Sequence, residues 1–250
     1  MRNTSKITGA LLLLIFASTL SAAAPKVIAT TGWTASFAQL AGVENLEVLA
    51  PYEMKHPPEY ELSLSELQKV AKADYIVFAG YEAMMTRIKE ALGSDSSVQL
   101  IQIKTINSYP LISESVMKIA AALGTEDKAL SNLKELKVFI SDWKAELAGQ
   151  DKLNNVVVHF HQQGPVKGLG LKPALVFGPS APTLIQIRDI LKIKPQIIID
   201  NLHNPAAASF KELMPRPDIV QWINFPGTDG TVSLLDVMNY NRQQLAKVLK

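Results

Sequence analysis

The fold of this chain is most constrained by the order of its apolar runs. Strand-like runs alternate with amphipathic helical patterns in two blocks, and a long stretch without strand signals separates the blocks. The N-terminal strand-like runs occupy residues 27–31, 46–49, 74–79 and 98–103. The C-terminal runs occupy residues 155–161, 174–177, 196–200 and 219–225. Continuous apolar strands that alternate with helices are typical of parallel sheets covered by helices on both faces. The sequence therefore predicts two α/β blocks.

The stretch between the two blocks, residues 114–149, has a helical pattern that is interrupted near Gly124. An apolar stripe with alternating steps of three and four residues predicts one long helix, and it consists of Leu133, Leu136, Ile140, Trp143 and Leu147. We predict an α/β fold with two lobes, each with a mostly parallel sheet covered by helices, joined by one long backbone helix. The predicted boundaries are 24–112 for the first lobe, 113–150 for the helical segment and 151–250 for the second lobe.

The first 23 residues have the pattern of a secretory signal peptide. Arg2 and Lys6 precede an apolar run over residues 7–20, which is too short to span a bilayer, and small residues follow. We predict cleavage after Ala23. The sequence contains no cysteine, so a lipid anchor at the cleavage site is not expected, and we predict a free periplasmic protein that is not embedded in a membrane.

The composition narrows the chemistry of any binding site. Without cysteine, a metal site must use His, Asp, Glu or backbone oxygens. The chain has 25 basic and 23 acidic residues, and removal of Arg2 and Lys6 leaves 23 of each. This balance gives no indication of a nucleic-acid partner, and we expect a monomer.

A histidine-bearing loop and a helix start form the clearest local signature. His56 and the pair Pro57–Pro58 follow the strand-like run at 46–49 and precede Ser63-Leu64-Ser65-Glu66. The Ser63/Glu66 pair predicts a capping box, in which each side chain accepts a hydrogen bond from a free backbone N–H. Since ligand groups in open α/β sheets lie beyond strand ends, His56 is a candidate metal ligand.

The other three histidines also lie at or just after predicted strand ends. His159 and His161 are two residues apart on one predicted strand, so their side chains would share a face and reach one ion. The alternative is a hydrogen-bonded core histidine and a surface histidine. His203 follows the strand at 196–200 and is either a ligand or a helix-entry residue. Asp229 is a candidate oxygen ligand or a simple turn residue.

Signatures of common enzyme classes are absent from the sequence. It has no phosphate-binding loop, no GxSxG nucleophile motif, no complete dinucleotide fingerprint and no HExxH zinc-protease helix. We therefore predict no catalytic activity. A zinc hydrolase that uses His159 and His161 is the alternative from another class, although no residue is a convincing general base.

The order of segments resembles the zinc- and manganese-binding solute receptors of bacterial ABC importers, the type with a rigid helical backbone. The segments that carry the resemblance are KVIATTGW, LAPYEMKHPPEYELSLSEL, KADYIVFAG, NNVVVHFH, PSAPTLIQI, QIIIDNLHNPAAASF and LLDVMNYNRQQL, and the resemblance runs from about Lys26 to Lys250. The resemblance implies a metal held between the lobes by three histidines and a carboxylate, and it aligns His56 and His159 with two of these histidines. His161 is the near alternative to His159.

Two positions depart from that family pattern. No histidine stands in residues 106–110, where the resemblance implies the second one, and Asn224 stands where the final aspartate is implied. Asp229 is a candidate substitute. The predicted function is capture of Zn2+, or alternatively Mn2+ or Fe2+, by His56, His159, His161 and His203, and delivery to a membrane permease. A receptor for a metal chelate or small organic ligand is the alternative.

Overall fold

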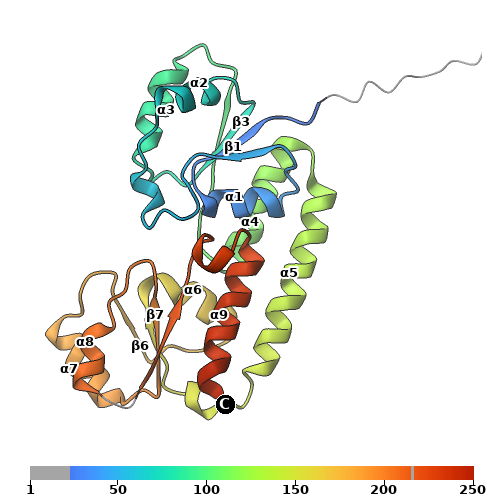
Figure 1. Cartoon of the computed structure of the whole chain (residues 1–250). Helices are drawn as coiled ribbons and strands as arrows, with labels where there is room; N and C mark the ends of the chain where they lie inside the picture. Colours follow the sequence, from blue (N-terminus) through green and yellow to red (C-terminus); the bar gives the residue numbers. More distant parts are fainter. Residues whose placement is uncertain (1–22, 215–216) are drawn as a thin grey trace, which may run out of the picture.

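The computed structural model describes residues 23–214 and 217–250 as two lobes stacked along a common set of helices (Figure 1). The predicted signal peptide, apart from its last residue, lies outside the described residues. The first lobe contains the parallel sheet β2-β1-β3-β4. Its strands and helices are β1 Val27–Ala29, α1 Gly32–Leu40, β2 Leu46–Val48, the 3-10 helix η1 Pro57–Glu59, α2 Leu64–Val70, β3 Tyr75–Phe78, α3 Met84–Leu92 and β4 Gln99–Gln102.

The second lobe contains the parallel sheet β6-β5-β7-β8. Its elements are η2 Asp151–Leu153, β5 Val157–His159, η3 Phe160–Gln162, α6 Gln163–Gly168, β6 Leu175–Phe177, α7 Leu184–Ile193, β7 Ile197–Asn201, α8 Ala208–Leu213, β8 Asp218–Trp222, η4 Thr228–Gly230 and α9 Leu234–Leu249. In both sheets the first strand in the chain pairs with strands on either side, so each sheet has a switch in strand order at its middle. Crevices beyond the carboxyl ends of strands at such a switch are where open α/β sheets bind ligands.

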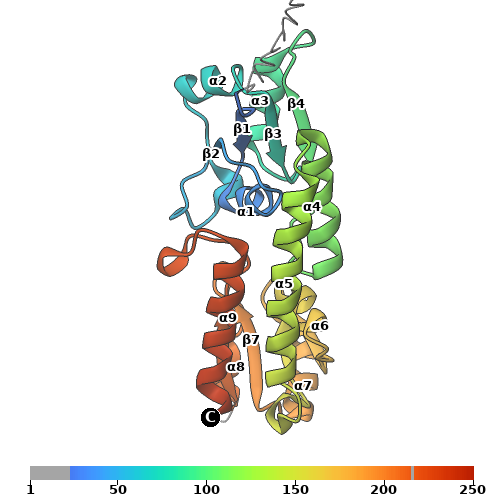
Figure 2. The same cartoon turned by 90° about the vertical axis from the view of Figure 1, so that its right-hand side faces the viewer.

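Two consecutive helices, α4 Tyr109–Leu123 and α5 Glu126–Glu146, connect the lobes. Figure 2 shows α5 running beside both lobes, with α9 alongside. The predicted stripe on α5 is largely confirmed, because Leu133, Leu136, Trp143 and Leu147 are buried. Trp143 packs against Trp222 of β8 with ring centroids 5.4 Å apart.

The lobes share one hydrophobic core. A single cluster of buried residues includes Phe37 of α1, Ile112 of α4, Leu136 of α5, Trp222 of β8 and Leu245 of α9. Each lobe has a further cluster of its own on the side away from these helices. The α/β two-lobe prediction is therefore confirmed, and the lobes are held by packed helices as well as by the covalent link.

Several local predictions are wrong. The predicted strand at 155–161 ends at His159, where the chain turns into η3. The sequence also predicts that Ser180 caps the helix that follows it, but the N-cap of α7 is Thr183. The helical spacing of apolar residues in the two segments predicts that Leu64 and Leu184 are buried, but they are 73% and 85% exposed. In short helices near a lobe surface, periodicity alone does not determine which apolar side chains face the core.

No helix of the described residues is both long enough and apolar enough to cross a membrane.

Candidate functional site

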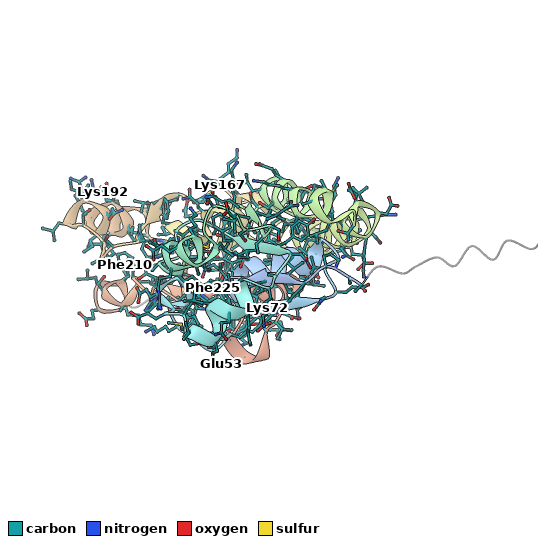
Figure 3. The ribbon with its side chains drawn as sticks, turned by 90° about the horizontal axis from the view of Figure 1, so that it is seen from above. Glu53, Lys72, Lys167, Lys192, Phe210 and Phe225 are labelled. Atoms are coloured by element: carbon teal, nitrogen blue, oxygen red, sulfur yellow. The ribbon has the colours of Figure 1, made fainter. Side chains whose placement is uncertain are left out.

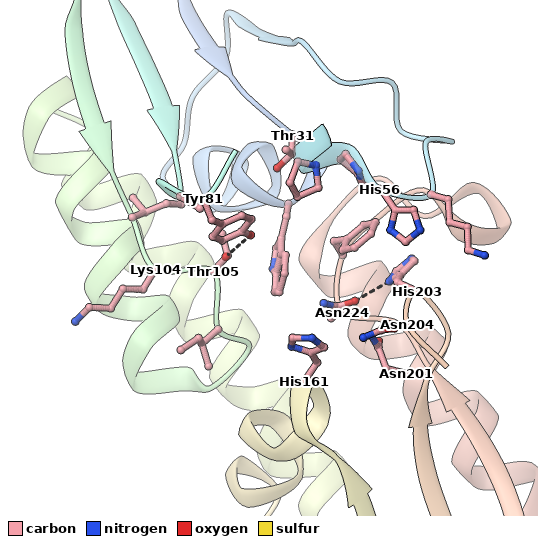
Figure 4. A pocket seen from close by; sticks show the side chains of 18 of the residues that line it. Thr31, His56, Tyr81, Lys104, Thr105, His161, Asn201, His203, Asn204 and Asn224 are labelled. Atoms are coloured by element: carbon pink, nitrogen blue, oxygen red, sulfur yellow. Dashed lines mark hydrogen bonds between the residues drawn. The ribbon is translucent and has the colours of Figure 1, made fainter. Parts of the chain in front are cut away.

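A cavity of about 870 Å³ lies where the carboxyl ends of the two sheets face each other (Figure 4). The lining residues come from the segments that follow seven of the eight strands, together with Gln102 at the end of β4 and Lys118 of α4. Three of the four predicted ligands line this cavity, namely His56, His161 and His203. The fold thus brings histidines from both lobes to one space.

His56 is positioned by the loop and the helix start that the sequence predicted. It is the N-cap residue of η1 and its side chain is exposed. The capping box of α2 is confirmed: Ser63 Oγ accepts from Glu66 N at 3.3 Å, and Glu66 Oε2 accepts from Ser63 N at 2.8 Å. The carbonyl of Pro58 accepts a hydrogen bond from Ala83 N, which ties the loop to the segment after β3. These contacts hold the backbone beside His56.

His203 is fixed more tightly than His56. Its Nδ1 lies 2.6 Å from Asn224 Oδ1, and its ring stacks on Phe225 at 3.6 Å between centroids. An amide oxygen accepts only, so Nδ1 donates and Nε2 keeps its lone pair, which faces Thr228 Oγ1 at 3.5 Å. Burial lowers the pKa of His203, the hydrogen bond to Asn224 opposes this, and the nearby His56 lowers it further. A neutral imidazole with one bonded N–H is the form that binds metals.

His159 and His161 do not share a face, which corrects the prediction for this pair. Because the strand ends at His159, His161 turns into the cavity while His159 is fully buried. His159 Nδ1 accepts a hydrogen bond from His161 N at 3.2 Å. Its Nε2 has no partner among the described residues and lies beside Gly178, whose added Cβ would be 2.6 Å away.

The alternative for this pair, a hydrogen-bonded core histidine, describes His159. Burial lowers its pKa to about 4, the carboxylate of Asp200 opposes this shift, and His161 lowers it slightly more. Burial also lowers the pKa of His161. His159 does not line the cavity, although its ring centroid is only 5.3 Å from that of His161. Of the two, only His161 has access to a ligand in the cavity.

Asp229 does not complete a metal site in this arrangement. It is exposed in η4 and does not line the cavity. Within residues 23–214 and 217–250, no group of three or more His, Cys, Asp or Glu side chains is close enough to hold one ion. The predicted four-histidine set is therefore not assembled at one point.

Asparagines, which the sequence reasoning largely passed over, determine much of the site. Asn201, Asn204 and Asn224 line the cavity beside His203. Buried Asn107 connects the lobes, because its Oδ1 accepts from Trp33 Nε1 at 3.0 Å and its Nδ2 donates to the Asn224 carbonyl at 2.8 Å. The available signal was position: Asn201 and Asn224 come at or just after strand ends.

No Asp or Glu is among the described residues that line the cavity. The carboxylate of Glu82, in the segment after β3, is buried. It accepts hydrogen bonds from Thr30 Oγ1, Ala79 N and Gly80 N at 2.6–2.8 Å. These three donors fix the loop after β3 and leave this carboxylate occupied.

Two parallel sheets face each other by their carboxyl ends, with a cavity between them and long helices along one side, and together they define a two-lobe α/β architecture with a helical backbone. No family model matches the chain, and no curated protein matches it. Solved structures of this architecture do match, at low sequence identity.

Three of these structures illustrate the likeness. The laminin-binding protein Lmb of Streptococcus agalactiae, described as an adhesin with metal-transporting activity, has a TM-score of 0.68 and 14% identity over 90% of this chain and 99% of its own. The solute-binding protein FpvC of Pseudomonas aeruginosa, solved with Mn2+, has a TM-score of 0.68 and 14% identity over 90% and 97%. ZnuA has a TM-score of 0.66 and 14% identity over 91% and 100%. This chain shares their fold over nearly its whole described length, which confirms the fold implied by the family resemblance.

Proposed function

We propose that this protein is a periplasmic solute-binding protein of an ABC importer, which captures a divalent transition metal in the interlobe cavity and delivers it to a membrane permease. The observation that carries the proposal is the convergence of His56 from the first lobe with His161 and His203 from the second on one cavity. The likeness to FpvC, solved with Mn2+, and to the metal-transporting Lmb supports the same class of ligand.

The ligand chemistry favours zinc. Imidazole nitrogens without thiolates suit Zn2+, while Mn2+ and Fe2+ prefer sites with more oxygen ligands. His203 supplies the best prepared nitrogen, because Asn224 accepts its Nδ1–H and an ion at Nε2 has to displace only the 3.5 Å contact with Thr228 Oγ1. The lowered pKa values of His161 and His203 keep both rings neutral, and therefore able to bind a cation, at neutral pH.

A binding protein fits the cavity better than a zinc hydrolase does. A metal-dependent hydrolase needs a base or a second charged group near the activated water. The described part of the lining offers no carboxylate for this role. His159, which the hydrolase alternative requires, is buried away from the cavity.

Isothermal titration calorimetry of the metal-free protein with ZnCl2 and MnCl2 tests metal capture. We expect a micromolar or tighter dissociation constant for Zn2+. His56→Ala and His203→Ala should each weaken binding by roughly tenfold or more, since each removes one of two neighbouring candidate ligands. His159→Asn is the matched control and should bind normally. The proposal fails if neither metal binds, or if His56→Ala and His203→Ala bind as well as the parent protein.

Delivery to a permease is tested separately in cells of the source organism that lack the gene. Zinc accumulation under zinc limitation should be restored by the parent protein and by His159→Asn, but not by His56→Ala. Equal accumulation with and without the protein would contradict a role in import.

A further inference from the structure

The cavity offers an incomplete coordination shell for a bare ion. A protein-bound zinc ion takes at least four ligands. His56 and His203 lie beside each other on one side of the cavity, and His161 lies apart from them (Figure 4). No three His, Asp or Glu side chains of the described chain are grouped around one point. A metal at the His56–His203 pair therefore keeps at least two positions for ligands that this protein does not supply.

The cavity is also much larger than an ion needs. A water molecule occupies about 30 Å³ in the liquid, so about 870 Å³ corresponds to roughly thirty waters. Ligand pockets for small organic molecules have about this volume. Tyr81 and Thr105 line the side opposite the histidine pair (Figure 4), and Trp33 and Ile106 also line the cavity. Tyr81 is 54% exposed, which leaves its ring surface open to a ligand.

The charge of the lining is opposite to what a bare cation requires. The charged residues of the lining are Lys55, Lys104 and Lys118. No carboxylate is among the described lining residues, so the formal charge of the lining is +3 when the histidines are neutral. Lys104 Nζ pairs with Glu114 at 2.9 Å at the edge of the cavity, and Lys118 Nζ donates to the Gln102 carbonyl. Lys55 forms no ion pair with any described residue.

We propose that the cavity binds its metal as an anionic organic chelate. The metal lies at His56 and His203, and the carboxylates of the chelator fill its remaining coordination positions. The organic body contacts Tyr81 and Trp33, while the lysines at the rim attract the negative charge. This inference rests on the proposed function and specifies the form in which the metal is captured.

The zinc complex of nitrilotriacetate is a suitable probe. It carries a negative charge, and its four donor atoms leave positions on the metal for two imidazoles. Three titrations of the metal-free protein are compared, with Zn2+ alone, with nitrilotriacetate alone and with the zinc complex. Native mass spectrometry then identifies what is bound. We expect a species that contains protein, zinc and nitrilotriacetate, with tighter binding of the complex than of either component.

Two variants and one control report on the second half of the cavity. The triple variant Lys55→Gln, Lys104→Gln and Lys118→Gln should weaken binding of the complex by roughly tenfold, since each exposed charge contributes modestly, and should not weaken Zn2+ binding. Tyr81→Ala should also weaken binding of the complex only. Lys72→Gln changes an exposed lysine of the first lobe that is labelled in Figure 3 and lies outside the cavity, and it should have no effect.

The outcomes separate the two proposals. If the protein removes zinc from nitrilotriacetate and the mass spectrum contains protein and zinc only, the chelate inference is overturned while metal capture stands. The same conclusion follows if the triple variant and Tyr81→Ala bind the complex as the parent does. If neither Zn2+ nor the complex binds, both proposals fail.

Discussion

The buried imidazole of His159 makes the stability of this protein depend on pH in a calculable way. Its side chain is fully buried, its Nδ1 accepts a hydrogen bond from His161 N, and its ring contacts the edge of Phe177 at 5.5 Å between centroids. Burial lowers the pKa to about 4 from an ordinary value of 6.5. The folded protein therefore excludes a proton that the unfolded chain binds.

The sign of the effect follows from the two pKa values. Above pH 6.5 the ring is neutral in both states, and its full contribution to stability is present. As the pH falls from 6.5 toward 4, the unfolded chain gains a proton and the folded protein does not, so stability is lost. One pKa unit corresponds to about 1.4 kcal/mol, which gives a limit of about 3.4 kcal/mol and a loss of about 2.5 kcal/mol by pH 4.5.

The perturbation is His159→Asn, because the amide oxygen of asparagine is able to accept the hydrogen bond from His161 N. Urea unfolding followed by tryptophan fluorescence at pH 7.0 and pH 4.5 gives the free energy of unfolding for both proteins. The variant will be less stable at pH 7.0, since it leaves a small cavity. Between the two pH values, however, the parent should lose about 2.5 kcal/mol more than the variant. Equal losses would refute a neutral, buried His159, because every other titrating group is common to both proteins.

Three further predictions test the surroundings of the site. Gly178→Ala should destabilise the fold more than Gly124→Ala, by about 1–3 kcal/mol in thermal or urea unfolding, because both positions have positive φ but only the first added Cβ meets a buried ring. Asn107→Ala should lower the free energy of unfolding by about 2–4 kcal/mol in the same assay, since it leaves a partly buried indole N–H and a buried carbonyl without partners; an unchanged value would contradict the bridge between the lobes. Asn224→Asp adds a carboxylate beside His203 and should tighten calorimetric binding of bare Zn2+ by roughly tenfold, and unchanged affinity would place the ion elsewhere.

Much of the first lobe was predictable because its signals are local. The capping box at Ser63 and Glu66 involves residues three apart, and any chain with this pair at a helix start satisfies its own backbone groups. The apolar stripe of α5 was predictable for a related reason: over 21 residues, the period of the helix defines one face unambiguously. Short helices such as α2 and α7 do not provide enough turns for this, and their exposed leucines were assigned to the core.

The metal-site prediction depended on contacts that no local pattern specifies. His159 and His161 look equivalent on an extended strand, but ladder pairing ends at His159, which pairs with Phe177, and the next residues turn into η3. The end of a strand is decided by its neighbours in the sheet, which lie far away in the sequence. The role of Asn224, which accepts a hydrogen bond from His203 21 residues away, is likewise a matter of where two loops meet.

The sequence by itself determined the two α/β blocks, the long connecting helix and the place of His56 after a strand, because periodicity and capping act over a few residues. Only the tertiary structure decided which histidines share a space. The facing of two separate sheets brings His56, His161 and His203 to one cavity, buries His159 beside Gly178 and leaves Asp229 outside. The tertiary structure also places lysines and amides, and no carboxylate among the described residues, around the cavity. The lining comes from segments that follow seven strands, and the packing of the two lobes brings these segments together.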